Sequence, residues 1–213
     1  LDIGMYKKAR DKKIWKLEVV NIRDYSQDKH QTVDDTPYGG GNGMLLRPDV
    51  VAAALDKNTK SEEKIIYLSP KGKRFNQKDA KLFSKLSKVN LLCGHFEGVD
   101  QRLLDTRNIE EYSLGDFILS GGETASFVFI DALVRLLPGV LGNKNSTLEE
   151  SFENDLLEYP QYTKPKEWEG KRPPEVLFTG DHAKIKGWRL SQSEAITRRQ
   201  RPDLWEKYLK RKK

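Results

Sequence analysis

The first hundred residues alternate short apolar segments, rich in β-branched residues, with segments of helical character. Polar, glycine or proline positions bound each apolar segment, which is typical of strands. Strands are expected over 14–22, 64–70 and 89–96, and helices over 49–57 and 76–88. Asn76 is placed to cap the second helix. Alternation of this kind favours an α/β fold with a largely parallel sheet.

The chain changes character near residue 141. Residues 123–137 form a strongly apolar helix, which Pro138 and Gly139 end. The residues that follow are polar and have little apolar surface to bury, which is typical of a flexible linker. We therefore expect three parts: an α/β domain over 1–141, a linker over 142–152 and a small helical domain over 153–213.

The C-terminal end carries the basic charge of the chain. Residues 182–200 and 202–212 have helical character, with Pro202 at a favourable first position. Residues 182–213 contain eleven Lys and Arg against three acids, a net +8, whereas the whole chain has +6. Interleaved aromatic residues make this segment resemble a surface that follows nucleic-acid phosphates. A solvated helix face with a basic tail explains the same charges.

Several classes of protein are excluded. No apolar run is long enough to cross a bilayer, so no membrane partner is expected. Cys93 is the single cysteine, which excludes an internal disulfide and fits a reducing compartment, the cytoplasm. His30, His95 and His182 are widely spaced, and we expect no metal site.

Three glycine-containing loops follow or end apolar strands, at residues 69–72, 94–98 and 113–123. Ligands of open α/β sheets bind beyond the carboxyl ends of the strands, where such loops converge. Each loop alone is explained by an ordinary turn, but together they favour a small-molecule site. No G-x-G-x-x-G follows a strand and no Walker A sequence occurs, so the usual nucleotide sites are unsupported.

Residues 34–44 hold four glycines in five positions, which no stable helix or strand interior tolerates. A flexible linker is one explanation. Linkers rarely carry adjacent carboxylates beside a Pro-Tyr pair, so we favour a loop that orders around a substrate.

Short sequence blocks that include these loops extend in order along nearly the whole chain. In order they are Thr32-Val33-Asp34-Asp35, Pro37-Tyr38-Gly39-Gly40-Gly41, Tyr67-Leu68-Ser69-Pro70, Cys93-Gly94 with Glu97-Gly98, Ser113-Leu114-Gly115-Asp116, Leu119-Ser120-Gly121-Gly122-Glu123 and Pro138-Gly139-Val140-Leu141-Gly142. In these blocks the chain resembles the bacterial tRNA (guanine-N1)-methyltransferase family. The family's first strand has no counterpart here, and we expect an N-terminal segment to be missing. His95 stands where the family often has Arg.

The resemblance implies a trefoil-knot methyltransferase domain of the SPOUT type, a homodimer, and S-adenosyl-L-methionine as cofactor. Cofactor contacts carry over to Tyr67, Leu68, Ser69, Pro70, Gly72, Gly94, Glu97, Ser113, Leu114, Gly115, Phe117, Leu119, Gly121 and Gly122. Substrate contacts carry over to Asp34, Asp35, Tyr38, Gly39, Gly40 and Gly41 near the target nucleotide, and to His182 and Arg189 on the anticodon arm of tRNA.

The implied reaction moves a methyl group to N1 of guanosine at tRNA position 37, next to the anticodon. N1 must lose its proton to attack, so a general base is needed, and charge developing on O6 needs a cationic partner. The family's Arg matches Arg135, and its Asp falls on Glu150, with Glu149 as a local competitor. Two alternatives stay open: a catalytically weak tRNA-binding module of the same fold, and another nucleic-acid enzyme with a small-molecule cofactor.

Overall fold

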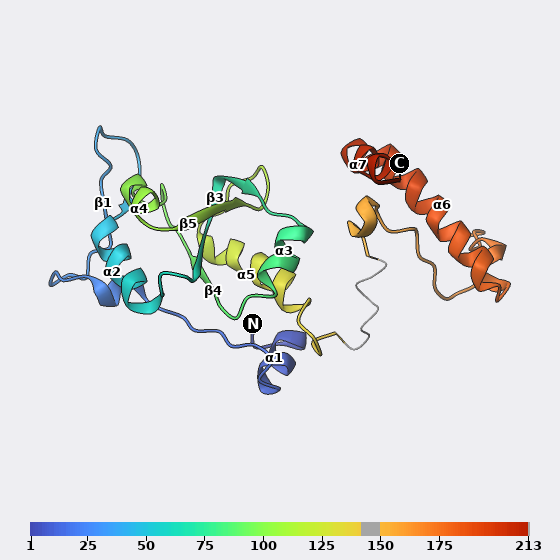
Figure 1. Cartoon of the computed structure of the whole chain (residues 1–213), viewed down its shortest axis with the longest axis horizontal. Helices are drawn as coiled ribbons and strands as arrows, with labels where there is room; N and C mark the ends of the chain where they lie inside the picture. The colour runs from blue at the N-terminus through green and yellow to red at the C-terminus, as the bar shows by residue number, and fades with distance from the viewer. Residues whose placement is uncertain (142–149, 213) are drawn as a thin grey trace. The chain divides into compact units, whose positions relative to one another are not determined.

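A computed structural model describes residues 1–141 and 150–212 of the chain. They divide into two compact units, Leu1–Gly142 and Asn143–Lys213. The first holds a parallel sheet with helices on both faces, and helices dominate the second (Figure 1). Most of the predicted linker, residues 142–149 with Glu149 among them, lies outside the described residues.

The sheet has the strand order β4-β3-β5, and both pairings are parallel. Its central strand β3 (Lys64–Arg74) lies between β4 (Val89–Leu92) and β5 (Ile109–Ser113). Tyr67 on β3 pairs in register with Leu92 of β4 and Glu111 of β5. The predicted α/β class with a parallel sheet is therefore confirmed.

One face of the sheet packs against α2 (Pro48–Asn58) and α4 (Gln101–Thr106). Ile65 and Tyr67 point to this side because side chains alternate along a strand. They share a buried cluster with Val51, which has no exposed surface. Burial of these side chains away from water holds α2 and α4 on the sheet.

The other face packs against α3 (Gln77–Phe83) and α5 (Gly122–Val134). Ile66 and Leu68 point to this side and join Phe129, which is 1% exposed. Because helices cover both faces, the start of β3 reads as an unbroken apolar run rather than an alternating one. Truncation of a buried phenylalanine such as Phe129 to alanine costs roughly 3–5 kcal/mol.

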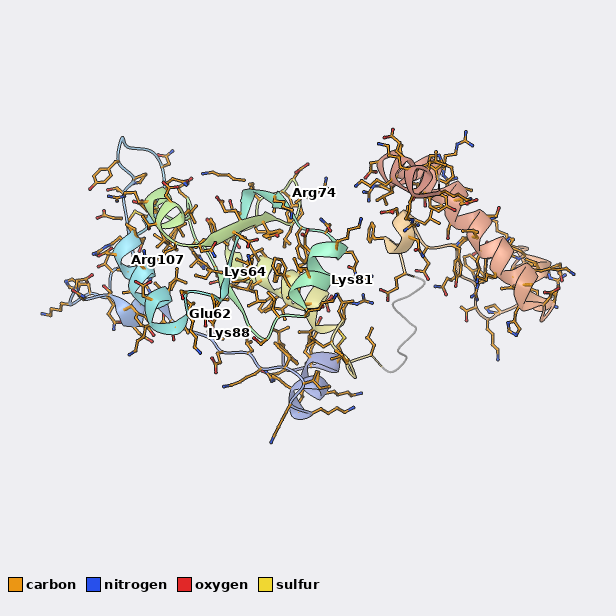
Figure 2. The ribbon with its side chains drawn as sticks, in the orientation of Figure 1. Glu62, Lys64, Arg74, Lys81, Lys88 and Arg107 are labelled. Carbon is orange, nitrogen blue, oxygen red and sulfur yellow. The ribbon has the colours of Figure 1, made fainter. Side chains whose placement is uncertain are left out.

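Charged side chains distinguish the two edges of the sheet. Lys64 and Lys88 lie at the amino ends of β3 and β4, and Arg74 lies at the far end of β3 (Figure 2). Lys64 pairs with Glu110, and Lys88 Nζ lies 2.8 Å from Glu63 Oε2. Ion pairs therefore join neighbouring segments at the amino ends of the strands. The glycine-containing loops lie at the carboxyl ends.

Asn76 caps α3, as the sequence predicts. Its side-chain oxygen accepts hydrogen bonds from the backbone N–H groups of Lys78 and Asp79, and Asp79 accepts one from the Asn76 N–H in return. This reciprocal pairing satisfies N–H groups that a helix start leaves without partners. The helix ends at Phe83, earlier than the predicted residue 88.

The predicted strand over residues 14–22 is wrong. This segment follows the short helix α1 (Gly4–Asp11) and runs as irregular backbone into a 3₁₀ turn at Ile22–Tyr25. Val19 is 85% exposed. Its β-branched residues suit a pleated surface, but a strand also needs a partner, and within the described chain no strand pairs with it.

The loop predicted at residues 69–72 is also different in the structure. β3 continues to Arg74, because Lys73 and Arg74 resume pairing with Tyr112 and Ser113 of β5. Leu68 pairs with Tyr112 as well, so the intervening residues bulge out of the ladder. The backbone of this segment therefore stays close to the sheet while its residues turn toward the carboxyl edge.

The second unit is built on α6 (His182–Gln200) and α7 (Pro202–Lys212), which confirms the two predicted helices. Thr197 is fully buried, and its hydroxyl accepts a hydrogen bond of 2.8 Å from the Leu157 backbone N–H. Tyr208 on α7 donates a 2.5 Å hydrogen bond to Glu194 on α6. Among the helices of residues 1–141 and 150–212, none has the length and apolarity to cross a membrane.

Candidate functional site

A pocket of about 380 Å³ opens at the carboxyl edge of the sheet, within the range of roughly 300–1,000 Å³ for small-molecule sites. Thirteen of the fourteen residues predicted to contact a cofactor line it: Tyr67, Leu68, Ser69, Pro70, Gly94, Glu97, Ser113, Leu114, Gly115, Phe117, Leu119, Gly121 and Gly122. Loops after three parallel strands meet here because the strands all end at this edge.

Gly72, the remaining predicted cofactor residue, is not among the residues that line the pocket. A Cβ at Gly72 would approach the backbone nitrogen of Tyr112 to 2.4 Å. A glycine is required there because β3 and β5 pass too close for any side chain. Its role in the structure is to let the bulge of β3 pack on β5.

Two other glycines press the loop after β4 against the start of α5. The Gly122 N–H donates a 2.8 Å hydrogen bond to the Gly94 carbonyl. A Cβ at Gly122 would lie 2.6 Å from the Cys93 Cα atom. A glycine is therefore required at position 122 for this close packing, and both Gly94 and Gly122 line the pocket.

The pocket wall combines apolar side chains with carboxylates. Leu68, Leu114 and Ile118 supply apolar surface, and Glu97 and Glu111 are acidic. Glu111 Oε2 is buried and accepts no hydrogen bond from the described residues. A buried acceptor without a donor is costly, so the wall suits a ligand with N–H or O–H donors and positive charge.

Sequence reasoning missed Glu111 as a pocket residue, and it placed His95 in the loop over residues 94–98 without assigning it a contact with the cofactor. Glu111 lies on β5, a strand that the sequence pattern did not predict. His95 follows directly after Gly94 and its ring lies 5.8 Å from that of Phe96. Its departure from the Arg common in the resembled family was the signal that could have drawn attention to it.

The predicted substrate loop begins and ends in a short antiparallel pair. Asp34 and Asp35 form β1 (Asp34–Asp35) and pair with β2 (Leu45–Leu46). Gly39, Gly40 and Gly41 all have positive φ angles, which confirms that this segment is a loop. Tyr38 at its tip is 95% exposed.

This loop adjoins the pocket through its C-terminal end. The Glu97 N–H donates a 3.0 Å hydrogen bond to the Met44 carbonyl, and the Leu46 N–H donates one of 3.0 Å to the Gly98 carbonyl. A Cβ at Gly43 would lie 2.6 Å from Glu97 Oε1. Predicted substrate and cofactor segments are thus side by side in the first unit.

The predicted catalytic residues lie in different units. Arg135 is the C-terminal cap of α5, where its N–H donates to the Asp131 carbonyl at 3.2 Å. Glu150 is half-buried and belongs to the second unit. Each unit therefore contains one of these two residues. Their action at one site stays a prediction.

Of the predicted anticodon-arm residues, His182 is the exposed first residue of α6, and the Arg189 guanidinium lies 4.8 Å from the Tyr159 ring centre. A hollow on α7 is lined by Glu206, Leu209, Lys210 and Lys212 from this one helix, and no predicted site residue contributes to it. Over the described residues, no three His, Cys, Asp or Glu side chains gather as metal ligands would.

The fold and the pocket define an α/β protein with a pocket at the carboxyl edge of a parallel sheet. Comparison with known families matches residues 1–207 to the family described as tRNA (Guanine-1)-methyltransferase TrmD. The chain belongs to the tRNA (guanine-1)-methyltransferase family.

Individual relatives agree with this family. A tRNA (guanine-N(1)-)-methyltransferase of Pelagibacter ubique is 67% identical over 210 residues, which cover 99% of this chain and 92% of that protein. Proteins of the same name from Brucella canis and Wolbachia pipientis wMel are each 50% identical, over 100% and 96% of this chain and 87% and 88% of theirs.

Proposed function

We propose that this protein transfers a methyl group from S-adenosyl-L-methionine to N1 of a guanine in tRNA, the guanosine at position 37 beside the anticodon. One observation carries the proposal: the loops that the family resemblance assigns to the methyl donor line one pocket. The names of the relatives support the same activity and do not favour a catalytically weak binding module.

The pocket suits S-adenosyl-L-methionine by the chemistry of its wall. This cofactor would supply a methyl group already activated on a positively charged sulfur. Glu97 and Glu111 offer negative charge, and the buried Oε2 of Glu111 can accept a hydrogen bond from the ligand. Leu68, Leu114 and Leu119 would exclude water from its apolar parts.

Proton removal from guanine N1 falls to Glu150 in this proposal. A carboxylate within hydrogen-bond reach of N1 accepts the proton as the nitrogen attacks. The Arg135 guanidinium would donate to O6, where negative charge develops. Glu150 keeps the carboxylate of the family's Asp and adds one methylene, which changes the position of its oxygens relative to N1.

The target base must leave its stack to reach the pocket. The loop over residues 36–44 adjoins the pocket and carries Tyr38, whose exposed ring can stack on a nucleotide. Asp34 and Asp35 at the start of this loop, with Gly39, Gly40 and Gly41, would contact the target nucleotide or its neighbour. The backbone at Gly39 and Gly40 has open space around it, so RNA can approach these residues closely.

Binding of the anticodon arm would involve α6 and α7, where His182, Arg189 and the basic residues lie. The family resemblance also implies a trefoil knot and a homodimer. Phe127 and Val128 on α5 are each more than half exposed, which supports burial of this apolar face against a second copy. Since its substrate is tRNA, the protein is expected to act in the cytoplasm.

The test is methyl transfer to defined tRNA. Purified protein, labelled S-adenosyl-L-methionine and a tRNA transcript with G37 should yield N1-methylguanosine in a nuclease digest analysed by mass spectrometry. The matched transcript with A37 should take up no label. Absence of product with the G37 transcript, although the methyl donor binds by calorimetry, would overturn the proposed activity.

A further inference from the structure

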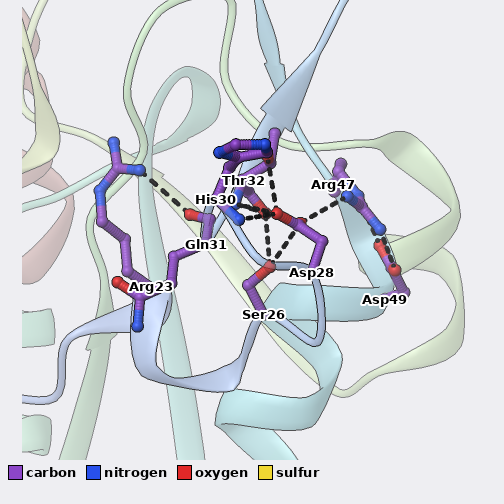
Figure 3. Close-up of polar contacts among 8 residues, drawn as sticks. All are labelled: Arg23, Ser26, Asp28, His30, Gln31, Thr32, Arg47 and Asp49. Carbon is purple, nitrogen blue, oxygen red and sulfur yellow. Dashed lines mark hydrogen bonds and ion pairs between the residues drawn. The ribbon is translucent and has the colours of Figure 1, made fainter.

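Asp28 organises a tight turn just before the substrate loop. Its Oδ1 accepts hydrogen bonds from the backbone N–H of His30 at 2.8 Å and the Thr32 hydroxyl at 3.1 Å (Figure 3). Its Oδ2 accepts from the Ser26 hydroxyl at 2.8 Å. These bonds, led by the one from Ser26, lower the pKa of Asp28 to about 2, so the carboxylate stays charged at neutral pH.

Arg47 connects this turn to the other end of the loop. Its Nη1 lies 3.5 Å from Asp28 Oδ2, while Nε and Nη2 lie 3.2 Å and 2.6 Å from the two carboxylate oxygens of Asp49 (Figure 3). The Arg47 backbone N–H also donates a 2.8 Å hydrogen bond to the Val33 carbonyl. One residue therefore bonds to segments on both sides of the loop.

The loop itself has weak internal constraints. Residues 36–44 include four glycines, and a turn closed by the Gly40 N–H and the Pro37 carbonyl lies within them. The supporting pair β1·β2 consists of two residues on each strand. A glycine-rich segment loses much conformational freedom when it is ordered, so the geometry of its two ends decides where the tip points.

We propose that Arg47 and Asp28 are positioning residues that close the base of the 36–44 loop and so hold Tyr38 in place for the target nucleotide. This inference rests on the proposed function for the role of the loop, and on the contacts above for the closure. Holding the loop near its bound position before tRNA arrives reduces the ordering cost of binding. Loss of these contacts should therefore raise KM for tRNA and leave methyl-donor affinity unchanged.

The experiment compares Arg47→Ala with Arg107→Ala. Arg107 makes the same kind of two-bond contact, to Asp56 at 2.9 Å and 2.8 Å, but on the side of α2 and α4 away from the loop (Figure 2). Two further variants test separate parts of the contact between Arg47 and Asp28. Arg47→Lys keeps a charge for Asp28 but loses the planar fork. Asp28→Asn keeps an oxygen for the turn but loses the charge that faces Arg47.

Closure of the loop and use of tRNA are measured separately on each variant of the 213-residue chain. Chymotrypsin cleavage after Tyr38, followed by mass spectrometry without tRNA, measures how well the loop is held. Steady-state methylation gives KM for tRNA and kcat separately, with methyl-donor affinity from calorimetry. For Arg47→Ala we expect cleavage to accelerate at least about fivefold and KM for tRNA to rise about tenfold, with kcat and donor affinity within about twofold.

Arg107→Ala should match the wild type in both readouts, and Arg47→Lys and Asp28→Asn should fall between. Cleavage of Arg47→Ala at the wild-type rate would overturn the closure of the loop. Faster cleavage with an unchanged KM for tRNA would overturn the role of the loop in nucleotide binding while the closure stands. A wild-type protein that methylates no tRNA would refute the proposed function instead, and the cleavage result would remain valid.

Discussion

His95 Nε2 lies 2.8 Å from Glu123 Oε1, and this contact joins the loop after β4 to the first turn of α5. The backbone supports the same connection, because His95 forms an isolated bridge with Gly121. Burial alone would raise the pKa of Glu123, but the hydrogen bond from His95 and one from its own backbone lower it. The two loops that close the pocket are therefore held together by a pair of titratable groups.

Methyl-donor affinity should depend on pH through this pair. The hydrogen bond from His95 favours the ionised carboxylate of Glu123, so the contact is intact while Glu123 is charged. The lowered pKa of Glu123 keeps the carboxylate charged at neutral pH, and its contribution is lost as the pH falls through that pKa. We expect calorimetric affinity to be constant near neutral pH and to fall about threefold as the pH falls through the pKa of Glu123.

Substitution separates Glu123 from the other titratable groups nearby, namely Cys93, Glu97, Tyr67 and Glu111. Glu123→Gln removes the ionisable carboxylate, so its affinity should stay nearly constant as the pH falls. His30→Gln, at an exposed histidine of the Asp28 turn, should keep the wild-type profile. A pH dependence that survives in Glu123→Gln would assign it to one of the other groups.

Gly121→Val should abolish methyl-donor binding while most of the fold is kept. A Cβ at Gly121 would lie 2.8 Å from Glu123 Oε2 and 3.0 Å from the His95 ring. The larger side chain therefore displaces this pair and fills the pocket mouth. Calorimetry should detect no donor binding. Gly187→Val, at a helical glycine with open space around it, should bind normally. Normal binding by Gly121→Val would show that this loop does not meet the donor.

Affinity for tRNA should fall steeply with salt, because each phosphate contact releases bound counterions. Deletion from Pro202 onward should weaken tRNA binding and spare the donor, but it would also remove Leu204 and Tyr208, which are buried in the second unit. Lys207→Gln with Lys210→Gln removes two exposed charges and keeps that core. We expect this double variant to reduce the slope of log affinity against log salt.

The control for the salt experiment is Lys57→Gln with Lys60→Gln, which removes the same charge from the last turn of α2 and the residues just after it in the first unit. It should leave the slope unchanged. Equal slopes for the two double variants and the wild type would mean that α7 is a solvated helix face, as one interpretation of the sequence allows.

The sequence predicted the layers of the first unit because apolar runs and helix periodicity report burial directly. The run at Ile65, Ile66 and Leu68 implies a strand covered on both faces, which fixes a parallel sheet. Convergence of the glycine loops then follows from the common direction of the strands. The Asn76 cap could also be predicted from the sequence, since an N-cap depends on neighbours within a few residues.

What the sequence did not predict depends on distant pairing. β5 was missed because Glu110 and Glu111 lower its strand propensity, yet Glu110 pairs with Lys64 and Glu111 faces the pocket. The bulge of β3 arises where Lys73 rejoins β5, which no local pattern records. The His95–Glu123 contact joins residues that are 28 positions apart, so no local sequence pattern indicates it.

The last prediction concerns the general base. Glu150→Gln keeps the shape of the side chain and its capacity for hydrogen bonding, but the amide cannot accept the N1 proton. Its single-turnover rate should fall by about a hundredfold or more, the usual scale of general-base loss, with tRNA and donor affinity little changed. Glu149→Gln, the adjacent control outside the described residues, should fall far less. Similar losses in the two variants would mean that the base lies elsewhere.

Two further variants test the geometry of the same assignment. Glu150→Asp restores the residue that the family resemblance places here, so it should retain activity; a loss as large as that of Glu150→Gln would contradict the assignment. Arg135→Lys should also slow single turnover, because a point charge cannot reproduce the planar fork toward O6. If Glu150 and Arg135 act on one guanine, the double variant should lose far less than the product of the two single losses, since residues that act as a unit are not additive.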